Sequence, residues 1–218
     1  MLRLALIVLT AAAAAVAQQD RIPVDNEWIR VVRTQSAPGY QSKPHRHEVN
    51  RVMIHLDAGQ MRLAYTGGAV KDLNWEAGQV RWDPAGGEHT SRNTGPSPFR
   101  IVEVELKKPG GGAVRWPPQD PIQVDPKHYT VLLDNPQVRV VRARYGPRDN
   151  GPMHQHSLRR VTVNLTDQEV ELTLPGGEKR QLLRKAGEVV WTTEPGSHSE
   201  INLRNEPFEV ILVEVKGG

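Results

Sequence analysis

Histidines are the residues of this chain best suited to chemistry. The chain has 8 His in 218 residues, and six of them form two sets with the same internal spacing: His45, His47 and His89, then His154, His156 and His198. Three imidazoles can hold one side of a divalent transition metal ion and leave positions open for water or substrate. The alternative is that these histidines only cap loops. Because the same three-histidine set occurs twice, this alternative is weakened.

The two sets belong to an internal repeat. His45 and His154 are 109 positions apart, and so are His89 and His198. The same offset, without a gap, relates several further residues of the first half to identical residues of the second: Arg30 to Arg139, Trp82 to Trp191, Asn93 to Asn202 and Phe99 to Phe208. A register kept over a whole unit predicts two homologous domains.

Each unit consists of short apolar runs between turn residues, which is a β pattern. Examples are residues 51–56 and 99–106 in the first unit, and 160–165 and 208–215 in the second. No segment of the predicted mature chain combines a long period of 3.6 residues with helix caps. The chain is therefore predicted to be all-β. Residues two apart in a strand share one face, so His45 and His47 can present their imidazoles side by side, and His89 comes from a later strand.

The predicted organisation is a signal peptide, two domains and a linker. Residues 4–17 are apolar apart from Thr10, which suits a signal peptide (1–17) cleaved after Ala17 and a secreted or periplasmic location. The domains are predicted at 22–107 and 128–217, joined by a Gly/Pro-rich linker at 108–127. No second apolar run reaches spanning length, so no membrane partner is expected once the signal peptide is removed.

Composition narrows the chemistry further. With 0 Cys the chain can form no disulfide, thiolate metal site, iron–sulfur cluster or cysteine nucleophile, so any metal ion must be held by His, Asp or Glu. The 28 basic and 25 acidic residues are interspersed and give a net charge of +3, which makes no electrostatic case for nucleic acid as a partner. The expected partner is a small-molecule ligand or substrate, and the oligomeric state stays open.

These spacings resemble the two motifs of the cupin superfamily, G-x5-H-x-H-x3,4-E-x6-G and G-x5-P-x-G-x2-H-x3-N. The second motif is complete in the first unit, with Gly78, Pro84, Gly86, His89 and Asn93. In the second unit Thr193 and Pro195 replace its Pro and Gly, while Gly187, His198 and Asn202 are kept. The resemblance covers nearly all of the predicted mature chain. It implies two tandem cupin-type jelly-roll β-barrels, each with a cavity at its mouth.

One residue departs from the cupin pattern in both units. The glutamate that follows H-x-H in the first motif is Arg51 in the first unit and Arg160 in the second. A guanidinium group is always cationic and cannot coordinate a metal ion, so each site would rest on imidazoles alone beside a positive charge. A period of two places His45, His47 and Arg51 on one face, and likewise His154, His156 and Arg160.

Three interpretations follow, and whether the protein is an enzyme stays open. In the first, the histidines bind a divalent transition metal (Fe, Mn, Zn, Ni or Cu) and Arg51 or Arg160 holds a substrate carboxylate, as in an oxygenase, isomerase or lyase acting on a small acid. In the second, a metal-free cationic pocket binds an anionic or sugar-like ligand. In the third, the arginines are structural and pair with Glu105 and Glu214.

Four further residues complete the sequence-based predictions. Trp82 and Trp191 occupy a strand position just before the turn of the second motif and are candidates to line the cavities with the arginines, although core packing is favoured for both. His55 and His128 have no counterpart in the other unit and are interpreted as surface or strand residues. The sequence does not name the substrate, the metal or the reaction.

Overall fold

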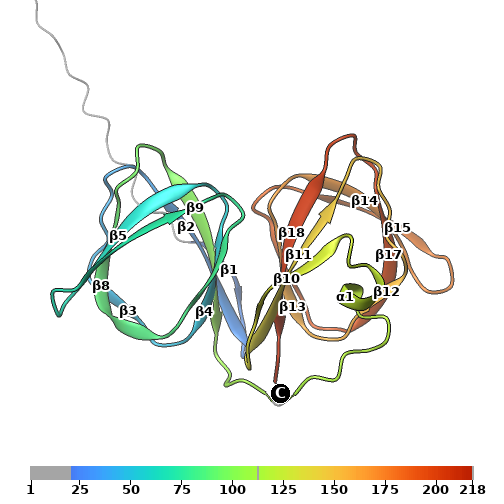
Figure 1. Ribbon diagram of the computed structural model, residues 1–218, viewed down its shortest axis with the longest axis horizontal. Helices are drawn as coiled ribbons and strands as arrows, with labels where there is room; N and C mark the ends of the chain where they lie inside the picture. The colour runs from blue at the N-terminus through green and yellow to red at the C-terminus, as the bar shows by residue number, and fades with distance from the viewer. Residues whose placement is uncertain (1–20, 112, 218) are drawn as a thin grey trace, which may run out of the picture.

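The computed structural model describes residues 21–111 and 113–217. The predicted signal peptide, residues 1–17, lies outside the described residues. The described chain forms two β-barrels that stand side by side, the first drawn in blue to green and the second in yellow to red (Figure 1). The prediction of an all-β chain with two tandem jelly-roll barrels is confirmed.

Barrel one is built from two antiparallel sheets. One has the strand order β1-β2-β9-β4-β7 and the other β3-β8-β5-β6. The strands are β1 (Arg21–Asp25), β2 (Ile29–Ser36), β3 (His45–His47), β4 (Arg51–His55), β5 (Gly59–Tyr65), β6 (Val70–Trp75), β7 (Val80–Asp83), β8 (Gly86–Asn93) and β9 (Phe99–Leu106).

Barrel two repeats this topology, with the orders β10-β11-β18-β13-β16 and β12-β17-β14-β15. Its strands are β10 (Tyr129–Asp134), β11 (Val138–Tyr145), β12 (His154–His156), β13 (Arg160–Asn164), β14 (Gln168–Thr173), β15 (Lys179–Arg184), β16 (Val189–Thr192), β17 (Gly196–Asn202) and β18 (Phe208–Val215).

The segment predicted as a linker contains a short helix, α1 (Pro121–Val124), which lies beside β12 of barrel two (Figure 1). Asp120 caps α1 by accepting a hydrogen bond from the Ile122 amide at 3.1 Å. Asp120 also accepts hydrogen bonds from both terminal nitrogens of Arg139 on β11, at 3.0 and 2.7 Å. The end of the segment is therefore fixed to the second barrel by a buried ion pair. No helix in the described part of the chain is long and apolar enough to cross a membrane.

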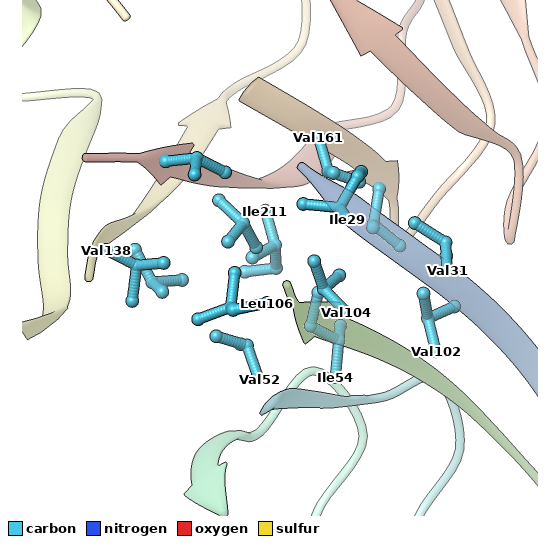
Figure 2. Close-up of a cluster of buried hydrophobic side chains, with 14 residues drawn as sticks. Ile29, Val31, Val52, Ile54, Val102, Val104, Leu106, Val138, Val161 and Ile211 are labelled. Carbon is cyan, nitrogen blue, oxygen red and sulfur yellow. The ribbon is translucent and has the colours of Figure 1, made fainter. Parts of the chain in front are cut away.

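Alternation along the strands of the larger sheets separates two environments. On β4, Val52 and Ile54 are fully buried on the outer face, while Arg51, Met53 and His55 point into the barrel. The outer residues of both barrels join in one hydrophobic cluster, seen in Figure 2 with Val52, Ile54 and Val104 from barrel one opposite Val161 and Ile211 from barrel two. The two five-stranded sheets thus pack against each other and exclude water from a shared core.

The contacts around this shared core are reciprocal. Gly78, in a left-handed turn conformation (φ 78°), accepts a hydrogen bond from the Arg142 guanidinium of the other barrel at 2.5 Å. Its counterpart Gly187 (φ 79°) faces the Arg33 guanidinium and Leu56 of barrel one. Each barrel thus offers the same turn to the same arginine of its neighbour, as in an interface with two-fold symmetry.

Candidate metal centres

In barrel one, β3 and β8 bring the three predicted histidines together. The backbones of His45 and His89 are paired in register, and His47 lies two residues along β3. The ring centroids of the three imidazoles are 5.1, 4.6 and 5.5 Å apart, and one nitrogen of each ring lies within 4.8 Å of the other two. That separation is suited to a shared metal ion about 2.1 Å from each nitrogen.

Hydrogen bonds to the backbone orient two of these rings. His45 Nδ1 lies 2.9 Å from the Lys43 carbonyl oxygen, and His89 Nδ1 lies 3.0 Å from that of Gly87. A carbonyl can only accept, so Nδ1 carries the proton and the Nε2 lone pair is left for a metal ion. Burial lowers the pKa of His89, which keeps its ring neutral, the form that coordinates metals.

Barrel two repeats this geometry closely. The rings of His154, His156 and His198 have centroid distances of 5.0, 4.5 and 5.4 Å, and their ligand nitrogens also lie within 4.8 Å of one another. His154 Nδ1 lies 3.0 Å from the Pro152 carbonyl oxygen, so this ring has the same orientation as His45. Burial lowers the pKa of both His156 and His198, and the neighbouring charge of Arg160 acts in the same direction. The two predicted histidine sets therefore both form compact clusters.

Two residues that the sequence analysis did not single out lie beside the second cluster. The Tyr129 hydroxyl is 3.2 Å from His154 Nε2 and donates a hydrogen bond to Glu200 Oε1 at 2.7 Å. Burial, with the Glu200 carboxylate next to it, raises the pKa of Tyr129 well above its ordinary value, so the hydroxyl keeps its proton. Glu200 could have been found from its position, because it lies two residues after His198 on the same strand face. Nothing in the sequence points to Tyr129.

Arg51 of barrel one has carboxylate partners. Its guanidinium donates to Asp83 Oδ2 from Nε at 3.1 Å and from one terminal nitrogen at 2.5 Å, and the other terminal nitrogen lies 3.4 Å from Glu103. The prediction that Arg51 pairs with Glu105 is wrong, because Arg30 on the adjacent strand β2 occupies Glu105 at 3.3 Å. Arg51 reaches Asp83 instead because the two residues are directly opposite on β4 and β7.

Arg160 of barrel two has no such partners. Thr192 and Leu212 stand where barrel one has Asp83 and Glu103. The predicted partner Glu214 is bound by Arg139 at 2.5 Å, so this pairing is wrong as well. Within residues 21–111 and 113–217, Arg160 forms no ion pair within 4.0 Å, and one of its terminal nitrogens is buried without a hydrogen-bond partner. Burial lowers its pKa, although the guanidinium stays cationic at neutral pH.

The cavities beneath the two clusters differ in size. The barrel-one cavity has a volume of about 60 Å³ and is lined by the histidines, Arg51 and Trp75. The barrel-two cavity has a volume of about 270 Å³ and is lined by His198, Arg160, Glu200 and a wall of apolar side chains. Trp75 is buried in the interior of barrel one, whereas its counterpart Arg184 lies in the wall of the barrel-two cavity, with its guanidinium 3.4 Å from Glu188.

The structure corrects the placement of four residues. Trp82 and Trp191 do not line the cavities; they lie on the outer strand faces and pack against the shared hydrophobic core, as the core-packing alternative predicted. His55 lies on strand β4, as the strand interpretation predicted, but both His55 and His128 are buried, with exposed fractions of 2% and 4%, so neither is a surface residue. His55 Nδ1 bonds the Gln79 carbonyl at 2.9 Å, and burial lowers its pKa to about 4. His128 lies between Asp125 and Asp149, with its two nitrogens 2.7 and 3.0 Å from their carboxylates.

Comparisons with known proteins agree with this geometry at the level of the fold. No known protein family and no curated protein matches the sequence. Among solved structures, AerE from Microcystis aeruginosa is similar over 92% of this chain and 98% of its own, with a TM-score of 0.64 and 13% identity.

Two further structures are similar. A Bacillus subtilis oxalate decarboxylase studied for its Mn(II) centres matches over 88% of this chain and 70% of its own, with a TM-score of 0.60 and 12% identity. A cupin 2 conserved barrel domain protein from Leptotrichia buccalis matches over 94% and 92%, with a TM-score of 0.54 and 11% identity. At these identities the likeness shows the fold and leaves the activity to the residues of this chain.

Proposed function

We propose that this chain, whose two-barrel fold is similar to that of solved cupin structures, is a bicupin of the cupin superfamily that binds a divalent transition metal ion in each barrel and acts on a small-molecule substrate. One observation carries the proposal: in both barrels three imidazole nitrogens lie within 4.8 Å of one another. Backbone carbonyls support it by orienting the rings of His45 and His89 with Nε2 directed away from them, and the ring of His154 in the same way, with the Tyr129 hydroxyl 3.2 Å from its Nε2.

The residues present fit such an ion in a three-histidine arrangement. His45, His47 and His89 would hold it in barrel one, and His154, His156 and His198 in barrel two. A bound ion would supply Lewis acidity toward a substrate oxygen. Burial lowers the pKa of His89, His156 and His198, so these rings need no deprotonation first. In barrel two the Tyr129 hydroxyl lies between His154 Nε2 and Glu200.

The metal belongs to the group Fe, Mn, Zn, Ni and Cu, for which imidazole is a suitable ligand. The Mn(II) centres named for the oxalate decarboxylase of similar fold make manganese the first ion to test. The apolar segment at residues 4–17 supports export, and we expect the secreted or periplasmic protein to begin at Gln18. Mass spectrometry of the exported protein checks that cleavage site.

A second candidate function is a metal-free bicupin that binds a small ligand or serves only as a structural protein. Two observations favour it. Arg51 and Arg160 place cations where the cupin pattern has a carboxylate ligand. In barrel two, the Tyr129 hydroxyl lies 3.2 Å from His154 Nε2, the nitrogen that a metal ion would need.

Elemental analysis separates the two candidates. The mature protein is purified without an affinity tag, supplied with Mn, Fe, Zn, Ni or Cu, dialysed and analysed by mass spectrometry. We expect about two equivalents of one metal, about one equivalent in each of the variants His47→Ala and His156→Ala, and none in the double variant. Less than about a tenth of an equivalent of every metal would overturn the proposal in favour of the metal-free function.

A further inference from the structure

Barrel two contains an inward-facing arginine that forms no ion pair within 4.0 Å in the described chain, whereas its counterpart in barrel one is paired. Arg51 and Arg160 occupy equivalent positions of the repeat, but Asp83 and Glu103 neutralise only Arg51. Among the described residues Arg160 has no ion-pair partner within 4.0 Å. One of its terminal nitrogens is buried without a hydrogen bond, as is the same nitrogen of Arg51, but only Arg51 has carboxylates beside it. A buried cationic donor without an acceptor costs free energy, which a bound anion would recover.

The acidic residues around Arg160 form no ion pair with it. Glu214 lies opposite Arg160 in the strand register, but Arg139 binds one oxygen of its carboxylate at 2.5 Å, and the other oxygen lies 3.7 Å from His156. Glu200 accepts a hydrogen bond from Tyr129 at 2.7 Å. Arg184, the other arginine of the cavity wall, lies 3.4 Å from Glu188. Arg160 is thus the guanidinium of this wall that remains available to a ligand.

The cavity in front of Arg160 has room for an organic anion. Its volume is about 270 Å³, compared with about 60 Å³ in barrel one. Several interior positions are smaller in barrel two than in barrel one: Thr162 for Met53, Val170 for Met61, Asn164 for His55 and Val190 for Arg81. The enlargement therefore follows from the sequence of the repeat.

Much of the lining of this cavity is apolar, and this selects the ligand class. Its polar lining includes Arg160, His198, Gln168 and Glu200, and its apolar lining comprises Val170, Leu172, Leu182, Phe208, Val210 and Leu212. Sites with a few polar groups and an apolar wall bind amphipathic small molecules. We infer that barrel two binds a small monocarboxylate with an apolar chain, its carboxylate on the Arg160 guanidinium and its chain against the apolar wall. The inference rests on the proposed function for a small-molecule ligand but does not require a metal ion.

Isothermal titration with hexanoate, and with hexan-1-ol as the uncharged probe, tests the inference on the full mature chain. We expect one hexanoate site per chain and binding of hexanol at least about tenfold weaker, because a charge-assisted bidentate contact is lost. Arg160→Gln should weaken hexanoate binding by about tenfold or more. Arg180→Gln, which removes an exposed arginine of barrel two paired with Glu178, is the matched control and should stay within about twofold.

A second variant tests the inference while Arg160 itself is kept. Thr192 lies opposite Arg160 just as Asp83 lies opposite Arg51. Thr192→Asp should therefore give Arg160 an internal partner and weaken hexanoate binding by about tenfold or more, with the barrel intact by circular dichroism. The inference is overturned if hexanoate binds no better than hexanol, or if both folded variants bind it like the wild type. Metal content, measured on the same samples, reports separately on the proposed function.

Discussion

Arg51 and Arg160 show how one repeat position can serve two purposes. Arg51 is buried between Asp83 and Glu103, so removing it would leave two carboxylates facing each other in a small cavity. Arg160 has no ion pair to lose within the described chain, and its guanidinium is partly desolvated. The same substitution should therefore have opposite consequences in the two barrels.

Arg51→Met should lower the free energy of unfolding by about 3 kcal/mol or more, because breaking a buried pair leaves uncompensated charge. Arg160→Met should change it by less than about 1 kcal/mol, or raise it, because a desolvated cation is replaced by an apolar side chain. Urea unfolding followed by circular dichroism measures both. Equal losses in the two variants would contradict this account of the pairing.

His55 makes stability depend on pH. Burial lowers its pKa from 6.5 to about 4, so the unfolded chain binds a proton between these values that the folded chain does not. Its contribution is fully present above pH 6.5 and is lost as the pH falls toward 4, an effect of about 3 kcal/mol. Asn164 is the counterpart of His55 in barrel two. It donates a hydrogen bond to the Glu188 carbonyl at 3.2 Å, as His55 does to the Gln79 carbonyl, but its amide does not titrate.

The free energy of unfolding should therefore decrease less between pH 6.5 and pH 4 in His55→Asn than in the wild type. The difference between the two decreases should be up to about 3 kcal/mol. The reciprocal variant Asn164→His is the control and should make the fall steeper. Chemical denaturation at several pH values provides the comparison. Parallel curves for the wild type and His55→Asn would show that His55 is not the group responsible.

At the scale of strands, the hairpin of β5 and β6 explains why barrel one is full. Gly59 lies opposite Trp75, whose indole donates to the Asp57 carbonyl at 2.9 Å and meets Phe99 edge to face. A Cβ at Gly59 would lie 2.6 Å from the indole ring and 3.0 Å from Phe99. In barrel two the equivalent positions are Gln168 and Arg184. No aromatic ring lies at the second position, so a side chain can be accommodated at the first.

Gly59→Ala should cost about 1–3 kcal/mol of stability, because the packed ring cannot move away without strain. Gly67→Ala, at a turn position with no atom within 4 Å of the added Cβ, is the control and should be close to neutral. Midpoints of urea unfolding report the difference. Combining Gly59→Ala with Trp75→Leu should recover part of the loss, and additive losses would argue against this contact as the cause.

The strands also show what the sequence could and could not predict. Both histidine clusters were predictable, because a period of two places His-x-His on one face and the repeat supplies the third residue. The partners of Arg51 were not predictable, because they depend on which strand pairs with β4 and on the conformation of a long side chain. The inner or outer face of Trp82 depends on the same cross-strand register, and Tyr129 reaches His154 from a strand 25 residues away.

For the molecule as a whole, the shared core predicts that the two barrels stabilise each other. Met53 and Ile54 are neighbours on β4 but face the barrel-one interior and the shared core respectively. Ile54→Thr should cost about 2 kcal/mol or more and reduce amide-exchange protection in β13 of barrel two as well as in β4.

Met53→Thr, the matched control, copies the residue of barrel two and should reduce protection in barrel one alone. Hydrogen exchange measured by mass spectrometry distinguishes the two patterns. If Ile54→Thr leaves β13 unaffected, the barrels unfold independently and the shared core does not couple them.

The reciprocal packing of the two sheets also bears on how such a chain can evolve. A duplicated domain is ordinarily free to decay once one copy suffices. Here the outer faces of the two copies bury each other, so loss of either copy would expose the apolar face of the other, whatever the function of its pocket. Inward-facing positions escape that constraint and can drift, which makes room for a second ligand specificity inside a scaffold that cannot be discarded.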